Sequence, residues 1–258
     1  MSRTQTIARN TPALFLAGDL VFISLHIALR LANRLEAWPM FSIYRDGGYP
    51  EVFQYVKEAG IAVALVAVAF RAREYRYLAW SALFFFLLLD DSLGIHELIG
   101  GQLVAAWQLS SHLGIRGQDF GELAAEALTG GLLLAALAFC YWRGSARFRK
   151  VSRQLFSLLM IVIFFGVFVD SLHFLYEINW KMGLLMVVIE DGGEMVGMSL
   201  AVWYAIRLLQ CNGKVEKSLV AVLLDRRGVF TPIPKFCQTL PSGIKYARKD
   251  LNPQPSDP

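Results

Sequence analysis

The stretch LLLDDSLGIHELIG, residues 87–100, decides what kind of fold this chain adopts. It ends an apolar run that starts near Tyr77 and is long enough to cross a membrane, yet it contains two aspartates, a histidine and a glutamate. A charged side chain at the bilayer centre costs roughly 2.5–3.5 kcal/mol even on the mildest scale. The sequence therefore predicts a membrane helix whose outer half faces other polar groups rather than lipid.

Composition places the whole chain in the class of integral membrane proteins. Of its 258 residues, 55% are apolar and 18% are charged, whereas an average soluble domain has about 25% charged residues. The mean hydropathy is +0.45, and apolar runs of bilayer-spanning length recur along the chain. The net charge of +4 comes from loops and the C-terminal tail and does not indicate nucleic-acid binding. We therefore predict an all-α, polytopic membrane protein.

The apolar runs divide the chain into one membrane domain and one tail. They follow a helical repeat, whereas a membrane β-barrel would need many short alternating segments. Prolines and basic residues interrupt any repeat near the C-terminus, so residues 212–258 are predicted to be a poorly ordered cytoplasmic tail. Residues 1–211 are predicted to form a bundle of six transmembrane helices, at about 11–32, 51–72, 77–99, 120–142, 154–177 and 184–209.

Basic residues in the short loops predict the orientation of this bundle. The loop RAREYR, residues 71–76, has three arginines, and RGSARFRKVSR, residues 143–153, has five basic residues and no acid. The alternate loops have fewer basic residues, and these are diluted by acids. Because loops rich in lysine and arginine stay in the cytoplasm, both termini are predicted to be cytoplasmic. We expect a bacterial inner (plasma) membrane protein with its polar layer facing outside.

Ionisable side chains of four predicted spans lie at a common depth in the outer half. Asp170, His173 and Glu177 are three and four residues apart and share one helix face. Glu190 and Glu194 share a face in the next span. Because ionised carboxylates repel one another, this layer requires protons, salt bridges or bound cations. The two remaining spans contribute Asp90, Asp91, His96, Glu97, Glu122 and Glu126.

Carboxylates mixed with imidazoles favour a divalent metal site. The spacing Asp170-x-x-His173 resembles the Glu-x-x-His ligand pair of di-iron helical bundles. We expect iron, manganese or zinc, and we expect Glu97, Glu122 and Glu177 to act as catalytic proton carriers beside the metal. The predicted metal ligands are Asp91, His96, Glu126, Asp170, His173, Glu190 and Glu194.

The expected function is a metal-dependent membrane enzyme, an oxidoreductase or a hydrolase, acting on a lipid or another hydrophobic substrate. A proton- or cation-coupled transporter is an alternative, because buried acids also mark ion pathways. A transporter needs a polar path to the cytoplasm, however, and the inner halves of the last four predicted spans are almost purely apolar. A third alternative is an accessory subunit of a membrane complex.

Overall fold

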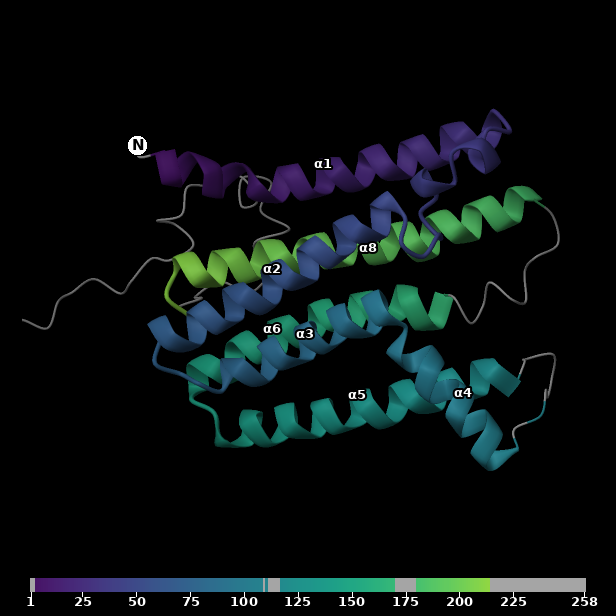
Figure 1. The fold of residues 1–258 in the computed structure, drawn as a ribbon. Helices are drawn as coiled ribbons and strands as arrows, with labels where there is room; N and C mark the ends of the chain where they lie inside the picture. Colours follow the sequence, from purple (N-terminus) through teal and green to yellow (C-terminus); the bar gives the residue numbers. More distant parts are fainter. Residues whose placement is uncertain (1–2, 109, 111–116, 170–179, 214–258) are drawn as a thin grey trace, which may run out of the picture.

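A computed structural model describes residues 3–108, 110, 117–169 and 180–213. All regular elements in these ranges are helical, and the long helices lie side by side (Figure 1). The predicted tail from residue 214 onwards lies outside the described residues. The elements are α1 (Arg3–Leu31), the short helices η1 (Leu35–Ala37) and η2 (Pro39–Phe41), α2 (Tyr49–Arg71), α3 (Tyr77–Leu93), α4 (Ile95–Trp107), α5 (Gly117–Arg143), α6 (Ala146–Ile163), the π-helix η3 (Phe164–Val169) and α8 (Trp180–Gln210).

Several of the helices have the length and apolar composition of membrane spans. Four are long and apolar enough to cross a bilayer, and the bent pair α3 and α4 makes a fifth if it counts as one span. The predicted all-α class is confirmed for the described residues, and the length and composition of these helices fit the predicted membrane bundle. The helix α8 has 31 residues but is not among these spans, since Lys181, Glu190, Asp191, Glu194 and Arg207 interrupt its apolar sequence.

The helix α8 lies at the centre of the bundle. It packs against α1, α2, α6 and η3, while α2 also packs against α3 and α3 against α5. Figure 1 shows the turns 72–76 and 144–145 at one end of the bundle, together with the start of α1 and the end of α8. We call this the basic end. The opposite end, with segment 32–48 and the junction of α3 and α4, is the polar end.

The apolar core occupies the half of the bundle near the basic end. Leu65 and Val68 of α2 are fully buried there, as are Phe148 of α6 and Leu208 of α8. The helix α6 begins at Ala146, eight residues before the predicted start at 154, because the Ser145 hydroxyl accepts a hydrogen bond from the Phe148 amide at 3.1 Å. The described members of the predicted layer of ionisable side chains lie in the other half of the bundle, near the polar end.

The predicted span 77–99 is wrong at its outer end. The helix α3 stops at Leu93, and Gly94 takes a left-handed conformation with φ +59° and ψ 42°, which glycine adopts without a steric penalty. The next helix, α4, then leaves at 74° to α3. Asp90 fixes this bend, because its carboxylate accepts the His96 amide at 2.8 Å and lies 3.3 Å from His96 Nδ1.

A close backbone contact joins α4 to α5. A Cβ added to Gly100 would lie 2.7 Å from the Glu122 amide nitrogen, and one added to Gly121 would collide with the Gly100 carbonyl oxygen. The two helices therefore touch through their backbones, as small residues allow in membrane bundles. This contact holds α4 against the bundle at the polar end.

Candidate functional site

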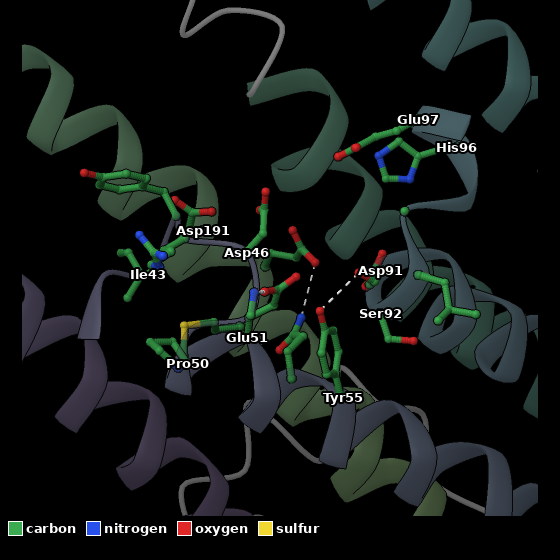
Figure 2. A pocket seen from close by; sticks show the side chains of 18 residues that line it. Ile43, Asp46, Pro50, Glu51, Tyr55, Asp91, Ser92, His96, Glu97 and Asp191 are labelled. Atoms are coloured by element: carbon green, nitrogen blue, oxygen red, sulfur yellow. Dashed lines mark hydrogen bonds between the residues drawn. The ribbon is translucent and has the colours of Figure 1, made fainter. Parts of the chain in front are cut away.

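Two cavities meet at the polar end of the bundle. The first, which we call the polar cavity, has a volume of about 550 Å³ and lies between segment 43–47, α2, the α3–α4 junction and α8. Figure 2 shows Asp46, Glu51 and Asp91 around its centre, with His96 and Glu97 on the α4 side. Its charged lining residues are two bases and six acids: Arg45, His96, Asp46, Glu51, Asp91, Glu97, Asp191 and Glu194.

The second, the apolar cavity, has a volume of about 440 Å³ and lies between α3, α5, α6, η3 and α8. Asp91, His96 and Glu194 line both cavities. These three side chains therefore form the boundary between a carboxylate-rich space and a hydrocarbon-like one. The apolar lining includes Leu83, Phe86, Leu87, Leu133, Leu134, Leu159, Val162, Ile163 and Met198.

Two acids face each other at this boundary. Glu58 of α2 is fully buried, and its carboxyl group lies within hydrogen-bonding reach of the Asp91 carboxyl group. Among the described residues, no other group donates a hydrogen bond to either oxygen of Glu58. Because ionised carboxylates only accept hydrogen bonds, this contact needs a proton or a cation between the two groups. The Tyr55 hydroxyl fixes α2 against α3 by donating to the Asp91 backbone oxygen at 3.1 Å.

Glu194 of α8 lies beside this pair. Gln54 Nε2 donates to its Oε1 at 3.2 Å, while the Gln54 amide oxygen is buried and has no donor among the described residues. The other oxygen of Glu194 lies against Gly166 of η3, where an added Cβ would come within 2.9 Å of it. Such π-helical turns are frequent at functional sites, and here the turn leaves room for a carboxylate.

A fully buried ion pair connects α2 to α1. Lys57 Nζ lies 2.9 Å from Asp19 Oδ1 and also donates to the Met195 backbone oxygen at 2.9 Å. The Ser199 hydroxyl donates to the second oxygen of Asp19. Both charged side chains have no exposed surface. The pair is thus a satisfied network, and Lys57 directly precedes Glu58 in α2.

The structure brings together some of the residues that the sequence predicts for the site. Asp91, His96 and Glu194 meet at the boundary, Glu126 lines the apolar cavity and Glu97 lines the polar one. Glu190 is on α8 but lines neither cavity, and Glu122 accepts a hydrogen bond from Gln118 at 2.9 Å beside the α4–α5 contact. The predicted residues Asp170, His173 and Glu177 lie outside the described residues.

The described part of the chain does not contain a group of three or more histidine, cysteine, aspartate or glutamate side chains arranged to hold a metal ion. Two of the predicted ligands, Asp170 and His173, lie outside that part. The metal centre therefore stays a prediction.

Three residues of this site are not among the predicted metal ligands or proton carriers. Gln54 and Glu58 are four residues apart, so they share the face of α2 that meets α3 and α8. This four-residue spacing is the feature of the sequence that could have identified Gln54 and Glu58 as members of the site. The third residue, Lys57, is a buried partner of Asp19 rather than a loop residue.

Comparison with known proteins gives a family without a described activity. No curated protein and no solved structure matches the chain. Residues 13–208 match the family described as "Domain of unknown function (DUF8692)", and this range contains every residue that lines the two cavities. The chain therefore belongs to the DUF8692 family.

Proposed function

We propose that this protein is an integral membrane protein of six spans, with both termini in the cytoplasm of a bacterium. The sixth span is α8, which packs against α1, α2 and α6. Its acids Asp191 and Glu194 are compatible with a membrane because they line the polar cavity. Arg71, Arg73 and Arg76 lie at the basic end, with Arg147 and Arg149 beside the other turn at that end. This distribution supports a cytoplasmic basic end and a polar end that faces outward.

We further propose that the protein is an enzyme acting on a lipid or another hydrophobic molecule, with the Glu58–Asp91 carboxyl pair as its reactive centre. One observation carries the proposal: the pair lies where a carboxylate-rich cavity meets an apolar one. The hydrocarbon part of a substrate would occupy the apolar cavity, and its polar end would reach the pair. Burying that hydrocarbon contributes about 0.8 kcal/mol for each CH₂ group.

Two carboxyl groups that share one proton can act as general acid and general base at once. The protonated member donates to the reacting group, and the ionised member accepts a proton from it. Glu58 and Asp91 come from different helices, and Tyr55 holds these helices together through the Asp91 backbone. The polar cavity beside them would supply water and accept the released proton.

A metal-dependent form of this enzyme is the second candidate. It is favoured by Glu194, which lies against Gly166, four residues before Asp170 in the sequence. With Asp170 and His173, the carboxylates of Asp91 and Glu194 would complete a site for a divalent ion. Elemental analysis of the purified protein tests it. Stoichiometric iron, manganese or zinc that is lost on Asp170→Asn would favour this form, and absence of metal would remove it.

Cation- or proton-coupled transport is the alternative function, and the Lys57–Asp19 pair favours it. The pair extends the polar groups from Glu58 to α1, beyond the acids at the cavity boundary. From there to the basic end, however, the described core is dominated by apolar side chains such as Leu65, Val68 and Leu158. Uptake of a cation by proteoliposomes, lost on Asp19→Asn, would favour transport.

Replacing Gly130 by leucine tests the hydrophobic-substrate proposal. Gly130 lines the apolar cavity, and a Cβ added there meets no atom within 4 Å, so a leucine side chain at this position has room to start into the cavity and reduce its volume. We expect purified wild-type protein to retain a hydrophobic molecule that solvent extraction and mass spectrometry detect, and we expect Gly130→Leu to lose it.

Gly183→Leu is the matched control for this experiment. Gly183 is also in a helix, has open space around a Cβ and lines neither cavity. Equal recovery of the molecule from all three proteins would contradict the proposal.

A further inference from the structure

We infer that the molecule held at this site is an amphiphile with a long hydrocarbon chain and a protonated primary amine as its head. The inference rests on the proposed function and specifies its substrate class. It is carried by three features of the described residues: the order of the two cavities, the excess of negative charge in one of them, and buried acceptors that lack donors.

The first feature is the order of the two cavities. The apolar cavity ends at Asp91, His96 and Glu194, where the polar cavity begins. A hydrocarbon chain along Phe86 and Leu134 would therefore end at the boundary residues. Cavities of this kind bind ligands through apolar walls and a few polar groups that fix the orientation.

The second feature is charge. Six carboxylates line the polar cavity against Arg45 and His96. His96 is already engaged by Asp90, at 3.3 Å from Nδ1. An anionic head, such as a carboxylate or phosphate, would meet repulsion here, while a cationic head would be attracted. The excess of carboxylates thus favours a head group with a positive charge.

The third feature is hydrogen bonding. Both carboxylate oxygens of Glu58 and the amide oxygen of Gln54 are buried acceptors with no donor from other groups in the described part of the chain. The two residues are one helical turn apart on α2 and both border Glu194. A primary ammonium group offers three N–H donors and one positive charge, whereas an alcohol offers one donor and a quaternary ammonium offers none. Of these three head groups, only the primary ammonium combines a positive charge with N–H donors.

Binding would exchange one cation for another. Before binding, a proton is shared between Glu58 and Asp91. When the ammonium group enters, the O–H bond of that proton breaks, the proton passes to water in the polar cavity, and N–H···O hydrogen bonds form to the freed carboxylate. The charge of the site is conserved, because one positive charge leaves as another arrives.

Binding of defined probes to the full chain in lipid nanodiscs tests the inference. We expect hexadecylamine to bind roughly tenfold to a hundredfold more tightly than hexadecanol, since charge-assisted hydrogen bonds are worth that much. We expect hexadecanoic acid to bind more weakly than either and hexadecyltrimethylammonium to fall below hexadecylamine. Glu58→Gln should reduce amine binding to the level of the alcohol. Glu36→Gln, which changes an exposed acid outside both cavities, should leave it unchanged.

The outcomes separate this inference from the proposed function. Equal binding of amine and alcohol, or amine binding that survives Glu58→Gln, would overturn the amine head while leaving a hydrophobic site in place. Failure of every hydrocarbon probe to bind, with no effect of Gly130→Leu, would overturn both. Tighter binding of the acid than of the amine would reverse the charge assignment and overturn the inference alone.

Discussion

Replacing Lys57 by methionine is expected to lower the free energy of unfolding by about 3–5 kcal/mol. Methionine keeps much of the length and volume of lysine but removes the charge. Asp19 would then be a fully buried carboxylate without its 2.9 Å partner, and Ser199 would be its remaining side-chain donor in the described part of the chain. Equilibrium unfolding of the protein in detergent, followed by circular dichroism, measures the change. The loss is large because the desolvation cost of Asp19 is no longer offset by its partner.

Two further variants show whether charge is the cause. Asp19→Asn combined with Lys57→Met removes both charges and should recover most of the lost stability. Arg76→Met breaks the partly exposed ion pair with Glu74, 2.6 Å apart, and should cost no more than about 1 kcal/mol. If Lys57→Met costs as little as Arg76→Met, then Asp19 is not buried as described.

Glu58→Gln is expected to raise the free energy of unfolding by about 1–3 kcal/mol while reducing binding of the proposed amine to the level of the alcohol. The glutamine amide can donate to the Asp91 carboxylate, so the buried contact no longer depends on a shared proton or a bound cation. Stability would rise because a group kept for function is replaced by one suited to the fold alone. The same unfolding assay and the probe titration measure the two effects.

Glu58→Leu is the control for this gain. Leucine fills space of similar size but cannot donate to Asp91, so the stabilisation should be absent. A loss of stability in Glu58→Gln as large as that in Glu58→Leu would mean that Glu58 serves the fold, contrary to the proposed role.

Helices could be predicted well from this sequence because apolar runs of membrane length have few other solutions. The bend at Gly94 could not be predicted from the sequence. A single glycine in an apolar run is common in straight membrane helices, and here its left-handed conformation depends on Asp90 capturing the His96 amide. The start of α6 was also missed, since Ser145 caps a turn that is rich in basic residues rather than apolar ones.

Three of the site residues, Asp91, His96 and Glu194, could be predicted from their common depth along the helices. They do meet, at the boundary between the two cavities. Helical spacing gives the face on which a residue lies but not the neighbour that this face meets. Glu58 and Lys57 are adjacent in sequence, yet one faces Asp91 on α3 and the other Asp19 on α1. These partners follow from the packing of α2 between its neighbours, which is a property of the tertiary structure.

Infrared spectroscopy of the carboxyl groups tests most directly whether Glu58 and Asp91 form one proton-sharing centre. We predict a C=O stretching band of a protonated carboxyl group in the wild-type protein, which shifts in heavy water, disappears on Glu58→Gln, disappears equally on Asp91→Asn, and is lost when hexadecylamine binds. A spectrum that contains only ionised carboxylate bands, or a protonated band that survives both substitutions, would contradict a shared centre.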